Sequence, residues 1–271
     1  MRLGAITSDF SWGSVSLLPS APYSIRDESR LCVLGLAFER QQGVHAVGGG
    51  RRQDFDAWPG ELAFTSPDVE MFSESGSGGE YLALHVRCVA PGREPAIPLP
   101  VPRAVFRGDR RAVLLGKQLR RSMLASHPSP QLIEEQAMSV LDHGLSLLAL
   151  PHPARGSHDH DRQAHARVLA YIDDALDGPL SLDEIALVAG MPVLRFLRSF
   201  SIAVGTTPHA YITERRMQRA RALLGSTDDP IADIAANCGF AHQSHLGAVF
   251  KDRLGLSPRQ YRVLAGSAGI S

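Results

Sequence analysis

The 271-residue sequence has few cysteines, no excess of charge of either sign and no long hydrophobic run. Lysine plus arginine and aspartate plus glutamate each number 28, so the charge of the whole chain gives no indication of nucleic-acid binding. The three cysteines, Cys32, Cys88 and Cys238, are odd in number and lack the spacing of metal ligands. We therefore expect structural thiols in a reducing compartment and no metal site.

The sequence also lacks the hydrophobic segments that target a chain to a membrane. No apolar run approaches the length of a membrane span. Met1–Gly4 are followed by acidic and polar residues rather than by the apolar core of a signal peptide. These features predict a cytoplasmic protein with no membrane partner.

The first half of the chain changes its pattern near residue 108. Residues 12–106 contain short apolar stretches separated by glycine- and proline-rich turns, which favours a compact β-barrel or sandwich. Residues 109–148 then show helical spacing, with a break at Pro128-Ser129-Pro130. The two predicted helices carry apolar stripes, one of Leu114, Leu115, Leu119 and Met123, the other of Leu132, Ala137, Val140, Leu141, Leu145 and Leu148. Each stripe can cover the barrel or pair with a second subunit; covering is favoured for the first helix and pairing for the second.

Residues 151–163 show no apolar periodicity and are predicted to be a linker. Three histidines lie in or next to it, His158, His160 and His165. Without a scaffold to hold them they are expected to be solvated, so no metal site is predicted.

The last hundred residues contain one helical pattern twice. Ile185 and Gly190 of the first copy recur 49 residues later, whereas Phe200 recurs 50 residues later as Phe250. Ser181 and Glu184 fit a capping box, and Thr207, Asp229 and Ser257 each stand as a possible N-cap before a proline. A helix over about 208–224 joins the copies. Two tandem helix-turn-helix units of this spacing suit two neighbouring major-groove segments of DNA.

The second copy also carries a family resemblance. Residues 231–262, IADIAANCGFAHQSHLGAVFKDRLGLSPRQYR, resemble the signature of the AraC/XylS family of transcriptional regulators. The match extends over roughly 165–264 and includes both units and the segment 219–224. The resemblance implies double-stranded DNA as partner, a homodimer, activation of transcription and RNA polymerase as a further partner.

The resemblance also indicates which side chains of the first unit face DNA. Leu194, Leu197 and Arg198 fall where relatives read base edges, and Arg195 lies among them. A guanidinium can bind guanine through two hydrogen bonds, so Arg198 is the strongest candidate, whereas the leucines can contact only thymine methyl groups. Pro192 and Ser201 replace the serine cap and the lysine that relatives commonly have.

In the second unit the predicted base-reading side chains are polar: His242, Gln243, Ser244 and His245. Ala248 stands where relatives often have an arginine, and Gly247 is a poor helix former. Phosphate contacts are expected from Arg215, Arg216 and Lys251. The alternative for the two arginines is that they solvate a helix face.

Residues 58–67 resemble the Pro-Gly turn and following strand of cupin-like barrels, which family members use to sense effectors. His45 lacks the second histidine of a metal cupin, and Phe72 stands near the position of the late ligand. No metal, no cofactor and no enzymatic activity are therefore predicted. The candidates for an effector pocket are His45, Arg52, Trp58 and His85.

Together these patterns predict an α+β protein with two domains. Residues 1–150 form a cupin-like sensing or dimerisation domain, 151–163 a linker, and 164–271 an all-α DNA-binding domain. One alternative is a small-molecule-binding cupin, with or without enzymatic activity, whose helical domain is a partner-interaction module with degenerate DNA readout. A DNA-repair methyltransferase or glycosylase needs a zinc-binding cysteine cluster and a reactive cysteine, which the chain lacks.

Overall fold

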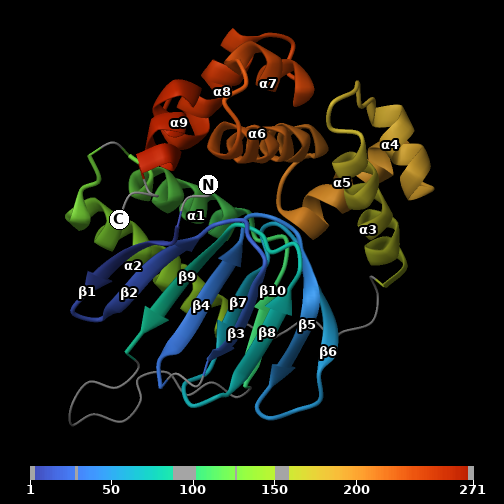
Figure 1. The fold of residues 1–271 in the computed structure, drawn as a ribbon. Coiled ribbons are helices and arrows are strands. Elements are labelled where there is room, and N and C mark those ends of the chain that lie inside the picture. Colours follow the sequence, from blue (N-terminus) through green and yellow to red (C-terminus); the bar gives the residue numbers. More distant parts are fainter. Residues whose placement is uncertain (1–3, 28–29, 88–101, 126, 150–158, 268–271) are drawn as a thin grey trace. The chain divides into compact units, whose positions relative to one another are not determined.

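A computed structural model describes residues 4–27, 30–87, 102–125, 127–149 and 159–267 (Figure 1). Contacts divide the chain into two units. The N-terminal unit consists of Gly4–Met123 and His127–His152, and the C-terminal unit is made mainly of Pro153–Ser271. The α+β class predicted from the sequence is confirmed, because the strands lie in the N-terminal unit and the C-terminal unit contains helices alone.

The N-terminal unit is built on two antiparallel sheets (Figure 1). The six-stranded sheet has the order β1-β2-β9-β4-β7-β10, and the four-stranded sheet the order β3-β8-β5-β6. The described strands do not join the two sheets into a closed barrel, so the cupin-like barrel stays a prediction. The strands are β1 Ile6–Phe10, β2 Gly13–Leu18, β3 Tyr23–Asp27, β4 Cys32–Ala37, β5 Gln41–Val47, β6 Gln53–Ala57, β7 Leu62–Thr65, β8 Met71–Ser75, β9 Tyr81–Val86 and β10 Arg103–Phe106.

Strand register separates the two faces of the six-stranded sheet. Leu34 pairs with Leu84 and with Phe64, so these three side chains share one face, because directly paired residues point the same way. All three are buried. A Cβ added at Gly144 would lie 2.9 Å from a Leu34 methyl group, which shows how closely the second helix approaches this face.

Helices α1 (Arg110–Met123) and α2 (Pro130–Leu148) cover that apolar face. Ser129 caps α2 and Pro130 follows it in the first turn, as the Pro128–Pro130 break predicts. Leu119, Met123, Ala137, Val140 and Leu141 of the predicted stripes are buried, whereas Leu114 and Leu132 are exposed. Both stripes therefore pack largely within their own unit.

The C-terminal unit consists of helices joined by short turns. The elements are α3 Asp159–Asp174, α4 Leu182–Ala189, α5 Val193–Val204, α6 Pro208–Ser226, α7 Ile231–Asn237, α8 Gln243–Leu254 and α9 Pro258–Ser267. The predicted connecting helix is confirmed as α6, with Thr207 as its N-cap. Ser257 Oγ accepts a hydrogen bond from Gln260 N at the start of α9. At α7 the N-cap is Pro230 itself, so the helix begins one residue later than the Asp229–Pro230 pattern predicts.

Other expectations meet different outcomes. The predicted linker at residues 151–158 lies outside the described residues, and α3 already begins at Asp159, inside the 151–163 range. Cys238 is a buried free thiol, as expected, but Cys32 is disulfide-bonded, contrary to the expectation of free thiols. Over the described ranges, no single helix has the length and apolarity of a membrane span, and only the α4–α5 pair, bent by 77°, passes on length and composition.

Candidate nucleic-acid interface

The first helix-turn-helix unit is formed by α4 and α5. Ser181 and Glu184 cap α4 reciprocally: Ser181 Oγ accepts from Glu184 N, and Glu184 Oε2 accepts from Ser181 N, both at 3.2 Å. The helix ends at Gly190, whose φ of 67° is the left-handed conformation that glycine adopts without strain. Phe196 and Phe200 of α5 are fully buried. These contacts fix the angle between the two helices.

The second unit repeats this arrangement with α7 and α8. Gly239, at φ 74°, follows α7, and a Cβ there would lie 2.3 Å from the Leu176 carbonyl oxygen and 2.7 Å from Arg216 Nε. Glycine is therefore required here by backbone conformation and by space. Leu246 and Phe250 anchor α8 from behind, since both are fully buried.

The predicted base-reading residues of α5 lie on its outer surface. Leu194 is 73 % exposed, Arg198 is exposed and Leu197 is half-buried. Arg195 is exposed too, but its Nη2 lies 3.2 Å from Asp161 Oδ1 of α3. The surface of α5 is therefore apolar with one unpaired cation, because the described residues offer Arg198 no ion-pair partner.

The predicted base-reading residues of the second unit surround the N-terminus of α8. His242, Gln243, Ser244 and His245 are all exposed. His242 is the N-cap, and its Nδ1 accepts from His245 N at 3.1 Å and lies 2.7 Å from Ser244 Oγ. Because Nδ1 is an acceptor, the neutral ring carries its proton on Nε2 and presents a donor to a partner.

The three side chains predicted to contact phosphate differ in their hydrogen bonds and their exposure. Arg215 Nε donates to Asp173 Oδ1 at 2.7 Å, and Arg216 donates to the carbonyl oxygens of Leu176 and Gly178 at 3.0 and 2.7 Å. These bonds connect α6 with α3 and the segment that follows α3. Burial lowers the pKa of the Arg216 guanidinium. Lys251 is exposed and, among the described residues, bonds only the Gly255 carbonyl at the end of its own helix. Lys251 is thus the most accessible of the three.

His165, predicted as a solvated linker residue, belongs to the interior of the first unit. It lies in α3, is 1 % exposed, and its ring contacts those of Phe196 and Phe200. Its Nε2 lies 3.1 Å from Ser199 Oγ. Burial lowers the pKa of His165, and Asp161 partly offsets this. The described residues contain no group of three side chains able to hold a metal ion.

The four candidates for an effector pocket are not brought together as one cluster. His45 stacks on Phe55, with ring centroids 5.2 Å apart. Arg52 lies over Phe72, 4.2 Å from the ring centroid. Phe72 pairs with Ala46, next to His45 along β5, so alternation places it on the opposite face of the four-stranded sheet.

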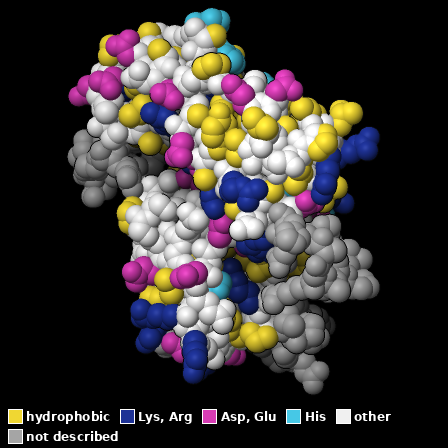
Figure 2. Space-filling view, turned by 90° about the vertical axis from the view of Figure 1, so that its right-hand side faces the viewer, with side chains coloured by type: hydrophobic (Ala, Val, Ile, Leu, Met, Phe, Trp, Pro, Cys, Tyr) yellow, Lys and Arg dark blue, Asp and Glu magenta, His cyan; other side chains and the backbone are white. Residues whose placement is uncertain are grey.

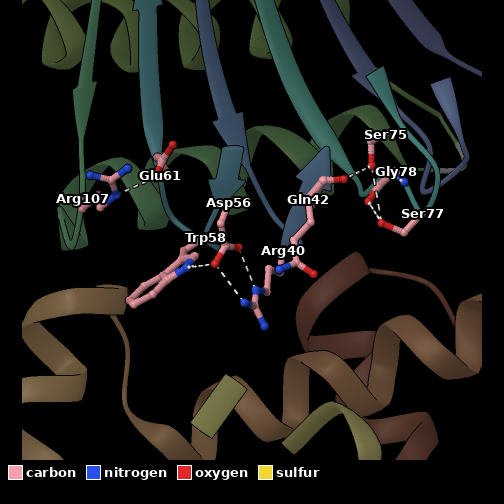
Figure 3. Close-up of polar contacts among 9 residues, drawn as sticks. All are labelled: Arg40, Gln42, Asp56, Trp58, Glu61, Ser75, Ser77, Gly78 and Arg107. Atoms are coloured by element: carbon pink, nitrogen blue, oxygen red, sulfur yellow. Dashed lines mark hydrogen bonds and ion pairs between the residues drawn. The ribbon is translucent and has the colours of Figure 1, made fainter. Parts of the chain in front are cut away.

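Trp58 and His85 are the other two candidates for the effector pocket. Trp58 is 2 % exposed, and its Nε1 donates to Asp56, which also holds Arg40 (Figure 3). His85 pairs with Val33 and Ser14 in the six-stranded sheet. Sequence reasoning missed Tyr81 and Arg103 on this same sheet. The alternation Tyr81-x-Ala83-x-His85 indicates a shared face, but only the register places Arg103 there.

Comparisons with known proteins match the C-terminal unit. A family profile described as a helix-turn-helix domain matches residues 185–263. The regulator MtrA of Neisseria gonorrhoeae is 34% identical over 86 residues, 32% of this chain and 29% of MtrA. The regulatory protein SoxS of Escherichia coli is 33% identical over 95 residues, 35% of this chain and 89% of SoxS. The chain spans about a third of the length of the first curated relatives that it matches.

Two solved structures each match about two fifths of the chain. An AraC-type DNA-binding-domain protein from Chromobacterium violaceum has 29% identity and a TM-score of 0.38, covering 40% of this chain and 96% of its own. The DNA-binding domain of AdpA, solved with a target DNA, has 28% identity and a TM-score of 0.37, covering 38% of this chain and 94% of its own. These TM-scores are low, so the assignment depends on the sequence relatives. SoxS is matched over nearly its whole length, and the chain belongs to the AraC/XylS family of transcriptional regulators.

Proposed function

We propose that the chain is a sequence-specific DNA-binding transcriptional regulator in which α5 and α8 enter neighbouring major-groove segments. The observation that carries this proposal is the repeat of one buried framework with an exposed helix surface in each copy. The matched relatives are named as regulators or activators, which supports the prediction that the chain is not an enzyme.

The two exposed helix surfaces offer different chemical groups for base recognition. Arg198 of α5 offers a bidentate donor to guanine, while Gln243 of α8 can read adenine through its amide. Lys251 and the free backbone N–H groups at the helix starts supply phosphate contacts. The near-neutral charge of the chain predicts modest affinity per monomer, so we propose a homodimer as the DNA-binding form.

The decisive experiment is selection of bound duplexes from a random DNA pool, using the full chain at a stated salt concentration. The expected result is an enriched motif with two segments about one helical turn, ~10 bp, apart. Recovery of salt-sensitive binding without any enriched motif would overturn sequence-specific recognition. Light scattering of the same sample, with and without the selected duplex, tests the dimer.

The N-terminal unit completes the proposal as a sensing or dimerisation module. An effector changes DNA binding only if its affinity differs between two arrangements of the protein. Activation through RNA polymerase is the expected output, since relatives such as RhaS are named activators. A reporter fused to the selected motif separates activation from repression.

A second candidate function is a partner-interaction module that has lost DNA readout. The observation favouring it is the apolar surface of the first unit, where Leu187, Leu194 and Ile202 are 81, 73 and 70 % exposed. Figure 2 shows apolar side chains gathered on one part of the face that it draws. Exposed apolar groups gathered in one region are typical of protein-binding surfaces. The random-pool selection distinguishes the two, because a degenerate module keeps its fold but enriches no motif.

A further inference from the structure

One arginine of the N-terminal unit lies between the two sheets without a carboxylate partner. Arg103 of β10 pairs with Thr65, which pairs with Val33, so all three point away from the helix-covered face that holds Leu34 and Phe64. Arg103 Nη1 donates to Thr65 Oγ1 at 2.8 Å. Within the described parts of the chain, no carboxylate lies at ion-pair distance from its guanidinium.

Other arginines that reach into this unit do have a carboxylate. The pairs are Arg40–Asp56 at 2.8 Å, Arg107–Glu61 at 2.6 Å and Arg120–Glu80 at 3.0 Å (Figure 3 shows the first two). A guanidinium stays charged at any physiological pH, and burying it without a counter-ion is unfavourable. Arg103 is half-buried and has no such pair, and Glu61, the carboxylate that acts on the neighbouring Tyr81, is already bound by Arg107. An external anion would therefore compensate the charge of Arg103.

The charge of Arg103 acts on side chains of both sheets. Burial raises the pKa of Tyr81 and lowers that of His45; the positive charge of Arg103 opposes the first shift and adds to the second. Because His45 belongs to the four-stranded sheet and Tyr81 to the six-stranded one, Arg103 acts across the space between the sheets. The Tyr23 hydroxyl donates to Gln41 Oε1 at 3.1 Å. Burial raises the pKa of Tyr23, and the charge of Arg103 opposes this rise.

The hydroxyl of Tyr81 is positioned by a glycine on the neighbouring strand. A Cβ added at Gly35 would lie 1.8 Å from the Tyr81 hydroxyl oxygen, so the tyrosine occupies the space that a side chain would fill. The Arg103 guanidinium acts on this hydroxyl, because it opposes the rise in the Tyr81 pKa that burial causes. A guanidinium can only donate, so a hydrogen bond between the two groups would leave the Tyr81 proton for a ligand.

We propose that Arg103 anchors a binding site for a small organic carboxylate between the two sheets. The carboxylate oxygens accept from the Arg103 guanidinium and from the Tyr81 hydroxyl, and the apolar body of the ligand lies toward the stacked His45–Phe55 pair. As an effector site this inference rests on the proposed regulatory function, and it names the chemical class that the N-terminal unit senses.

The test uses calorimetric titration of the full chain with sodium benzoate and with sodium hexanoate, each beside its neutral amide. Both carboxylates are expected to bind more tightly than the amides. R103Q should weaken carboxylate binding about 10- to 100-fold. R87Q is the matched control, because Arg87 is an exposed arginine at the end of β9 that bonds only a backbone carbonyl, and it should bind like the parent.

Tyr81→Phe provides a second, milder variant that removes only the hydroxyl group and should weaken carboxylate binding about 3- to 10-fold. The proposal is overturned if neither carboxylate binds, if the amides bind equally well, or if folded R103Q and Y81F both bind like the parent. These titrations contain no DNA. A failure here therefore leaves the random-pool result unaffected, and a failed selection leaves carboxylate binding unaffected.

Discussion

Tyr211 of α6 packs edge-on against Phe200 of the first helix-turn-helix unit, and Tyr261 of α9 packs edge-on against Phe250 of the second. Both pairs have ring centroids 5.8 Å apart. The turns also agree, because Gly205 after α5 and Gly255 after α8 both have a φ of 74°. The two frameworks are thus nearly the same, although their sequences coincide at few positions.

The exposed surfaces of the two units differ. Apolar side chains gather over the first unit, whereas histidines mark the surface of the second (Figure 2). The helix starts differ as well: Pro192 provides no side-chain cap for α5, while the His242 ring caps α8. Buried side chains hold each framework together, whereas exposed side chains can differ between the units without changing the packing. The comparison shows that the buried framework and the exposed surfaces are formed by separate residues.

The largest expected effect tests the shared framework. Phe200→Ala and Phe250→Ala each remove a fully buried ring, so each should lower the free energy of unfolding by about 3–5 kcal/mol. Chemical denaturation of each variant measures the loss. If the units are equivalent frameworks the two losses agree, and a loss confined to one variant would contradict the equivalence.

The next effect tests the difference between the exposed surfaces. Arg198→Ala should weaken specific DNA binding by about 1–3 kcal/mol, because it removes the proposed bidentate base contact, and should leave thermal unfolding almost unchanged. Arg259→Ala on α9 is the control, since Arg259 is exposed but lies outside both recognition helices. Binding to the selected duplex and to a scrambled one is compared at one salt concentration.

The converse substitution sharpens the same comparison. Ala248 of α8 occupies the position equivalent to Arg198, and it is exposed. Ala248→Arg should strengthen binding to duplexes with guanine at the facing position, while leaving affinity for other duplexes nearly unchanged. Equal strengthening on every duplex would mean that the new arginine contacts only phosphates.

The framework could be predicted from the sequence because its signals are local. Capping residues such as Ser181, the glycines of the turns and the spacing of Phe196 and Phe200 each act within a few residues of the chain. The expectation of a solvated His165 is wrong for the opposite reason. Its burial depends on α3 packing against α5, which the polar composition of residues 151–163 hides.

The same limit applies to the two candidate sites. Arg215 and Arg216 have the composition of a phosphate-binding surface, yet their donors bond groups on or just after α3, 38 to 42 residues earlier in the chain. No local sequence pattern marks Arg103, because its proposed role depends on the register of β10 against β7. Contacts between distant segments decide which charges are free, and a single sequence does not specify those contacts.

Buried His165 should make the stability of the first helix-turn-helix unit depend on pH. The pKa of folded His165 is below the ordinary value near 6.5, so the unfolded chain binds a proton first as pH falls. His165 therefore makes stability fall as pH drops through about 6.5, until the folded pKa is passed. Urea denaturation of the parent and His165→Gln between pH 8 and 5 should show a smaller decline for the variant. An equal decline would assign the pH dependence to other groups.

The smallest expected effect concerns a glycine inside α8. A Cβ added at Gly247 meets nothing within 4 Å, so alanine fits without moving a neighbour. Gly247→Ala should raise the free energy of unfolding by up to about 1 kcal/mol, because glycine is the poorer helix former. In the proposed complex with DNA, the added methyl group would face the groove. If Gly247 is there only to let α8 approach DNA closely, the variant gains stability and loses affinity for the selected duplex. A gain in stability with unchanged affinity would show that this part of α8 stays clear of the bases, leaving base readout in the second unit to the residues around the His242 cap.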